Sequence, residues 1–269
     1  MVQVLIGANR VISSSILNFD AFFTRRTDDR EKDSFVAHYG SGGEVLVHGT
    51  GFKYDAHGVL ISGVIKGFTD IDGYGRQASF NHMLLSVVSA KEVAETPKQA
   101  DDVALMRQQL SSHDVFSGGR HGDSFNSFDG DDVLHGNGGF DRLWGGGGSD
   151  RLIGGAEGDV LSGGAGVDTF LFEKARDSMQ KGVDKIVDFS IAEGDRLDLK
   201  SIDANGKANG FGQFQFIGNE EFSEERGQLR YEFHKASTLV AADIDGDGEA
   251  DIVISLKGNI ELSLDQFDI

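Results

Sequence analysis

Large apolar residues return at a nine-residue period through the middle of the chain. Residues 109–171 divide into seven consecutive nonads: QLSSHDVFS, GGRHGDSFN, SFDGDDVLH, GNGGFDRLW, GGGGSDRLI, GGAEGDVLS and GGAGVDTFL. The eighth position of every nonad is Phe or Leu, namely Phe116, Phe125, Leu134, Leu143, Leu152, Leu161 and Phe170. In an extended three-residue segment only the central side chain can point inward, so each nonad predicts one short strand with a single core residue.

One apolar residue in nine cannot form a core alone, so the nonads must stack. Two nonads make an 18-residue coil with a strand on each side, and stacked coils bury the Leu and Phe residues between two parallel sheets. The six residues before each strand are rich in glycine, which adopts the positive φ angles that a tight loop requires. We therefore predict a parallel β-roll over residues 109–171.

The segments before the nonads predict a small β-rich domain and a helix. SFVAHYG, GEVLVHG and GVLISGVIKG alternate or are rich in β-branched residues, which is typical of an antiparallel sheet within residues 1–95. Thr96, Pro97 and Gln99 form a helix start. The segment 96–110 is then a helix that caps the apolar end of the roll, or alternatively a free linker helix. The fold class is all-β, with residues 172–269 as a further C-terminal domain.

Composition favours cations as partners. The 269 residues include 44 acidic and 25 basic side chains, a formal net charge of -19, which argues against nucleic acid or anionic lipid as the main partner. Cysteine is absent, so neither disulfides nor thiolate metal sites hold the fold together. No apolar stretch approaches the roughly 20 residues of a membrane span, and the N-terminus lacks the pattern of a cleavable signal peptide.

An aspartate occupies the sixth position of every nonad. With a period of 18 residues, one column contains Asp114, Asp132, Asp150 and Asp168, and a second column contains Asp123, Asp141 and Asp159. Carboxylates one strand spacing apart repel one another, and a hard cation between the loops reverses that effect. Calcium accepts 6–8 oxygen ligands in flexible geometry, whereas magnesium requires a tight octahedron and zinc prefers nitrogen or sulfur. We therefore predict calcium as the ligand, with backbone oxygens joining from loop glycines: Gly130, Gly139, Gly148 and Gly166.

The number of calcium sites follows from the stacked pairs. Five pairs are separated by 18 residues (114/132, 123/141, 132/150, 141/159 and 150/168), which predicts about five ions at most from the repeats. Departures from glycine are expected to weaken some sites, and they occur at Gln109, Leu110, Ser112, His121, Ser127, Phe128, Asn137 and Glu157.

The nonads match the pattern G-G-x-G-x-D-x-U-x, which identifies the calcium-binding repeat of RTX proteins. The segments DSMQKGVDKIVDFSIAEGDRLDL, GQLRYEF, STLVAADIDGDGEADIVISLKG and NIELSLDQFDI follow. Residues 109–269 thereby resemble the C-terminal domain of serralysin-type secreted metalloproteases, where a calcium β-roll passes into a β-sandwich-like end. The resemblance implies that Asp177 and Asp184 close the calcium shell of the last coil.

The resemblance also assigns a role to the C-terminus. In RTX proteins an uncleaved C-terminal signal is read by a type I exporter, and SLDQFDI would be that signal here. The residues themselves are equally those of a plain terminal edge strand.

The resemblance stops before catalysis. The H-E-x-x-H motif of the zinc proteases does not occur. Residues 1–95 instead resemble the non-catalytic β-rich leader of many bacterial RTX proteins, including the G-T-G-F-x-Y-D run at residues 49–55. A zinc or haem site is not indicated, because the histidines lack tight ligand spacing. We expect satisfied or surface side chains for His38, His48, His57 and His82.

The stretch DIDGDGEAD places Asp243, Asp245 and Asp247 at the spacing of an EF-hand loop, with Gly248 next. An EF-hand needs a bidentate glutamate at the twelfth position, where this chain has Ile254. An isolated calcium loop and a solvated acidic hairpin both remain open.

These features predict a secreted, calcium-folded protein without catalytic activity. Glycine-rich backbone is costly to order and stacked carboxylates oppose folding, so the chain would stay unfolded in a calcium-poor cytosol and pass through a type I exporter. Outside the cell it would act as a binding or matrix protein whose N-terminal sheet contacts a polysaccharide or a cell surface. The alternative is a secreted enzyme with an unrecognised active site in residues 1–95.

Overall fold

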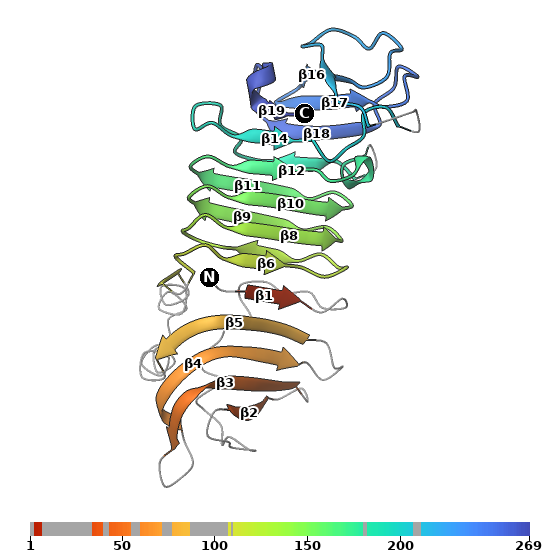
Figure 1. Cartoon of the computed structure of the whole chain (residues 1–269). Helices are drawn as coiled ribbons and strands as arrows, with labels where there is room; N and C mark the ends of the chain where they lie inside the picture. The colour runs from red at the N-terminus through yellow and green to blue at the C-terminus, as the bar shows by residue number, and fades with distance from the viewer. Residues whose placement is uncertain are drawn as a thin grey trace.

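The protein is all-β in the computed structural model (Figure 1), as the sequence predicts. The structure describes residues 3–6, 34–39, 43–54, 60–71, 77–86, 107–108, 110–179, 182–206 and 211–269. Within these residues no helical segment has the length and hydropathy to traverse a bilayer.

The strands fall into three successive groups. The N-terminal group consists of β1 (Gln3–Ile6), β2 (Ser34–Tyr39), β3 (Gly43–Tyr54), β4 (Leu60–Ile71) and β5 (Gln77–Ser86). The nonads form β6 (Val115–Ser117), β7 (Ser124–Asn126), β8 (Val133–Gly138), β9 (Arg142–Gly147), β10 (Arg151–Ala156), β11 (Val160–Ala165) and β12 (Thr169–Leu171). The C-terminal group consists of the 3-10 helices η2 (Ala175–Asp177) and η3 (Leu264–Gln266) with β13 (Asp184–Ile186), β14 (Arg196–Asp198), β15 (Gln215–Phe216), β16 (Gln228–His234), β17 (Ser237–Asp243), β18 (Ile252–Lys257) and β19 (Phe267–Asp268).

Two sheets run the length of the nonads. One has the strand order β19-β14-β12-β10-β8-β6-β1-β5-β4-β3-β2, and the other has the order β15-β16-β17-β18-β13-β11-β9-β7. Alternate nonads therefore contribute to opposite sheets. Neighbouring nonad strands pair in parallel with residue i opposite residue i+18, as in Leu134↔Leu152 and Leu143↔Leu161. The predicted roll with two nonads per coil is confirmed.

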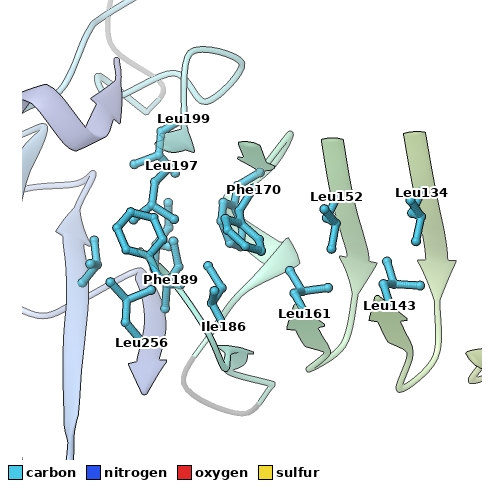
Figure 2. Packing of buried hydrophobic residues seen from close by; sticks show 14 of the residues in the cluster. Leu134, Leu143, Leu152, Leu161, Phe170, Ile186, Phe189, Leu197, Leu199 and Leu256 are labelled. Carbon is cyan, nitrogen blue, oxygen red and sulfur yellow. The ribbon is translucent and has the colours of Figure 1, made fainter. Parts of the chain in front are cut away.

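The eighth-position residues fill the space between the two sheets. Leu134, Leu143, Leu152, Leu161 and Phe170 have 0% of their surface exposed. Figure 2 shows them projecting from both sides into one continuous core. The C-terminal strands prolong the same core, because Phe170 lies opposite Leu197 and Leu161 lies opposite Ile186 in the sheets.

A strand covers the N-terminal end of one sheet. β1 pairs in parallel with β6, with Gln3 opposite Val115, and antiparallel with β5 (Figure 1). The N-terminal antiparallel sheet therefore continues directly from the first coil, an arrangement that the sequence did not indicate.

The predicted capping helix over residues 96–110 lies mostly outside the described residues. Arg107 and Gln108 are helical, and Leu110 is buried in the core cluster. The guanidinium of Arg107 donates to Asp129 at 3.2 Å and lies 5.1 Å from the ring centre of Phe128, so the end of this segment contacts the loops of the roll.

The C-terminal residues form the last strand of the longer sheet. β19 pairs in parallel with β14, which places Phe267 opposite Leu197 with 4% of its surface exposed. Arg196 binds this strand through its guanidinium, which donates to the carbonyl oxygens of Asp265 and Phe267 at 2.7 and 3.0 Å and to the carboxylate of Asp268 at 2.6 Å. The C-terminus is thus an edge strand fixed to the end of the roll.

Candidate metal centre

The sixth-position aspartates form the two predicted columns along the edges of the roll. None has more than 2% of its surface exposed. Beyond the first aspartate of each column, the carboxylate reaches the preceding coil, where its Oδ1 accepts a hydrogen bond from the backbone N–H of the aspartate 18 residues earlier. The donor–acceptor distance is 2.8 Å from Asp132 to Asp150 and 2.9 Å from Asp150 to Asp168. The aspartates therefore fix the register of the coils as well as concentrating negative charge.

The second carboxylate oxygen has no such partner. Oδ2 is buried and accepts no hydrogen bond from any described residue in Asp141, Asp150, Asp159, Asp168 and Asp184. A buried oxygen that carries charge and lacks a partner is strongly unfavourable unless a cation or a proton compensates for it. These oxygens mark the positions where the columns require a positive ligand.

Glycine at the first position of the nonad makes room for this oxygen. A Cβ atom built on Gly145 would lie 2.2 Å from Oδ2 of Asp150, and one on Gly163 would lie 2.1 Å from Oδ2 of Asp168. In the third nonad this position is Ser127, whose hydroxyl donates to the carbonyl of Gly145 at 2.7 Å. The loop thus leaves a cradle beside the carboxylate that a larger side chain would fill.

The loop glycines expected to present backbone oxygens all have positive φ. The angles are 132°, 95°, 128° and 124° at Gly130, Gly139, Gly148 and Gly166. Close stacking of the coils also requires glycine here, because a Cβ on Gly148 would lie 2.1 Å from the carbonyl oxygen of Gly130. In the sixth nonad Glu157 occupies the same position with a φ of 80°, a conformation that is costly for a residue with a side chain.

Burial raises the pKa of the column carboxyls far above their usual range. The pKa rises to about 7 at Asp150 and Asp168, chiefly through desolvation, and the neighbouring aspartates of the column raise it further. The same cause raises the pKa to about 8 at Asp141 and to about 9 at Asp184. The desolvated columns favour either bound protons or a bound cation over bare charge.

Asp177 and Asp184 lie at the end of the second column. Oδ1 of Asp184 accepts the N–H of Asp159 at 2.9 Å and so takes the place of the next nonad aspartate. Oδ2 of Asp177 accepts the N–H groups of Glu173 and Lys174. The negative charge of Asp177 raises the pKa of both Asp159 and Asp184, so the three carboxylates share one region of the roll.

Two further aspartates complete the roll, and the sequence reasoning missed both. Oδ1 of Asp195 accepts the N–H of Asp168 at 3.0 Å, and its Oδ2 accepts the N–H of Ser190 at 2.8 Å, so Asp195 ends the first column. Asp188 accepts the N–H groups of Gly163 and Gly164. The signal for Asp195 was an aspartate two residues before a buried leucine, Leu197, as in the nonads.

The acidic loop after β17 forms a separate cluster. Asp243, Asp245 and Asp247 each place a carboxylate oxygen within 4.8 Å of the other two. The loop is closed by its own backbone, since the carboxylate of Asp243 accepts the N–H groups of Gly246 and Gly248 at 2.6 and 2.9 Å. Ile254 lies buried in β18 and supplies no oxygen ligand. Metal binding by this loop stays a prediction.

The histidines add no evidence for another metal. His48 in β3 is partly buried, and the side chains of His38, His57 and His82 lie outside the described residues. Within the described residues the acidic loop is the one group whose carboxylate or imidazole atoms converge closely enough to hold an ion by themselves.

The residues of the columns fit calcium. Their potential ligands are carboxylate and backbone oxygens, and the loops alternate the two in a flexible glycine backbone. A hard divalent cation would supply the positive charge that the unpaired Oδ2 atoms lack. This chemistry defines a calcium-binding parallel β-roll.

Two known protein families match parts of the chain. Residues 111–143 match the RTX calcium-binding nonapeptide repeat, and residues 134–267 match the peptidase M10 serralysin C-terminal family. The chain therefore carries RTX nonapeptide repeats, which bind calcium, and a serralysin-type C-terminal domain. No curated protein matches it.

Thirty-four chains of solved structures match. One is the AlgE6R3 subunit of the Azotobacter vinelandii mannuronan C5-epimerase, with 26% identity, a TM-score of 0.34, and coverage of 59% of this chain and 79% of that one. Another is the AlgE6R2 subunit of the same epimerase, with 24% identity, a TM-score of 0.35, and coverage of 58% and 88%. The assignment to a family is based on the family models and on the roll itself.

Replacing Asp150 with Asn is expected to weaken calcium-driven folding. The variant replaces the unpaired Oδ2 with an amide donor and removes the charge, while Oδ1 can still accept the N–H of Asp132. We expect the calcium concentration at the midpoint of folding, followed by far-UV circular dichroism, to rise about tenfold, or roughly 1.4 kcal/mol. Glu261→Gln removes the same charge at an exposed position and should leave the midpoint within about twofold. Equal midpoints for both variants would contradict this role of Asp150.

The metal-free protein should gain structure as the pH falls. The column carboxyls have raised pKa values in the folded state, so the folded roll binds protons more readily than the unfolded chain does. Stability without metal is therefore greatest at low pH and is lost as the pH rises through about 7 to 9. Circular dichroism in chelator should show more β structure at pH 5 than at pH 8, and saturating calcium should remove this difference. More structure at pH 8 in chelator would overturn the argument.

Proposed function

We propose that a type I secretion machinery exports the chain unfolded and that calcium folds it outside the cell. The observation that carries this proposal is the set of buried aspartates whose Oδ2 atoms have no partner among the described residues. Without a cation these groups oppose folding at neutral pH, and with calcium they become ligands. A chain that is unfolded at low calcium and folded at high calcium suits export through a narrow channel.

Binding energy can supply the required stability. A ligand that binds only the folded state adds RT ln(1 + [L]/Kd), or about 2.7 kcal/mol per independent site at a hundredfold excess. We assign the sites to the stacked nonad aspartates, to the loop glycine carbonyls, and to Asp177 and Asp184 at the last coil. The summed binding free energy of several such sites is comparable to the whole free energy of unfolding of a typical domain.

The export signal in this proposal is SLDQFDI, residues 263–269. The serralysin-type C-terminal family is typical of secreted proteins, and the match to that family ends at residue 267. In the folded protein these residues form η3 and β19.

The proposal divides the chain into a β-rich domain at residues 1–95, a capping segment at 96–110, the roll at 109–171 and the C-terminal domain at 172–269. The family matches span residues 111–267, so the first domain is the part left to contact a ligand. We assign it a binding or matrix role, with an extracellular polysaccharide or a cell surface as partner. Its antiparallel sheet is continuous with the roll, which would act as a rigid support.

Calcium should fold the full-length chain whereas magnesium should not. Far-UV circular dichroism in chelator should report a largely unfolded nonad region, and added calcium should produce a cooperative change to β structure. Magnesium at the same concentration should fail, because it resists losing its water ligands for a flexible set of protein oxygens. Equal β structure in chelator and in calcium would refute calcium-driven folding.

Ligand binding should require the N-terminal domain. We expect the calcium-folded protein to bind one class of glycan on an array or to bind intact cells, and we expect deletion of residues 1–95 to abolish binding. The calcium midpoint of the deleted protein is the control for folding. Binding that survives the deletion would move the ligand site elsewhere, and turnover in hydrolase or peroxidase assays would favour the enzymatic alternative.

A further inference from the structure

A hollow lies on the C-terminal sheet. Its lining includes Val183, next to Asp184 at the end of the second column, and Gly248 of the acidic loop. It has a volume of about 440 Å³, and its walls include Arg230 of β16, Leu239 and Ala241 of β17, and Val253 of β18. Along β16, Arg230 alternates with Leu229 and Tyr231, which belong to the core cluster, so Arg230 projects from the opposite face of the sheet. The volume falls within the range of small-molecule sites.

Arg230 is the one basic residue among those that line the hollow. Only 8% of its side chain is exposed, and its Nε is buried without a hydrogen-bond partner in the described part of the chain. The guanidinium carbon lies 5.5 Å from the ring centre of Phe222, which also lines the hollow. A buried guanidinium with a spare donor is a site that still has capacity for an acceptor.

The present partners of Arg230 lie near solvent. Its two terminal nitrogens donate to Glu221 at 3.0 and 3.4 Å, and one of them lies 3.4 Å from a carboxylate oxygen of Glu232. The side chain of Glu221 is 86% exposed and that of Glu232 is 45% exposed. An ion pair with so exposed a carboxylate is weak, so an incoming acceptor can replace Glu221.

We propose that this hollow binds a small carboxylate with a short apolar body. The ligand carboxylate accepts two parallel hydrogen bonds from Arg230, one from the unpartnered Nε and one from the terminal nitrogen that now lies 3.4 Å from Glu221. The apolar body lies against Leu239, Ala241 and Val253. Arginine suits this role because its planar guanidinium matches a carboxylate, which a lysine ammonium does not.

The test is isothermal titration of the calcium-loaded full-length protein with hexanoate and with hexanamide, which has the same shape but no charge. We expect hexanoate to bind and hexanamide to bind at least tenfold more weakly. Glu221→Gln should tighten hexanoate binding several-fold, because it removes the carboxylate that competes for Arg230. Glu261→Gln is the matched control, since it removes the same charge far from Arg230 in the sequence at an exposed position, and it should leave binding unchanged.

Two further variants separate the charge from the space. Arg230→Lys keeps the charge and should weaken hexanoate binding about tenfold, and Leu239→Trp fills the hollow and should abolish binding. The calcium midpoint of each variant reports whether it folds, and Glu221→Gln, at an exposed position, tests the proposal even if the buried changes unfold the domain. No binding of hexanoate by the wild type, equal binding of the amide, or weaker binding after Glu221→Gln would each overturn the proposal.

Discussion

The structure depends on one carboxylate group that serves two coils. In each column Oδ1 of an aspartate accepts the N–H of the aspartate in the preceding coil, and Oδ2 remains buried beside a glycine. The first contact sets the register of the coils and the second oxygen demands a cation. Most nonads contribute a single apolar core residue, so hydrophobic burial by itself is limited in this region. The same aspartate therefore sets the register of the coils and supplies a ligand oxygen, and the register in turn aligns the core residues. A change to the aspartate is expected to affect all three.

The roll itself could be predicted from the sequence because its two constraints repeat at a fixed interval. Phe or Leu at position eight and aspartate at position six give the strand, the facing sheets and the 18-residue register directly. Beyond Asp168 the interval changes, since the columns continue through Asp184 and Asp195, which are 25 and 27 residues after their predecessors. Asp195 was missed for that reason, although it keeps the local pattern of an aspartate two residues before a core residue.

Other features arise from contacts between distant segments, which leave no local pattern. The parallel pairing of β1 with β6 joins the start of the chain to the first coil, and neither strand indicates the other in the sequence. The helix predicted over residues 96–110 stays a prediction, because the structure describes only Arg107, Gln108 and Leu110 of that segment. The burial of Arg230 likewise depends on Phe222 and Glu221, which reach it from the loop before β16. Alternation along β16 predicts the face of the sheet from which Arg230 projects, but it does not predict that Arg230 is buried.

The position of the C-terminal edge strand bears on the export route proposed above. β19 pairs with β14, and β14 pairs with β12, which directly follows Asp168 of the first column. Arg196 then holds the terminal strand through two backbone oxygens and one carboxylate. A receptor that binds residues 263–269 as an extended peptide would compete with their pairing to β14 and their contacts with Arg196 once the roll has folded. In the export route proposed above, folding would therefore hide the signal after export, and no cleavage would be needed to prevent the protein from returning.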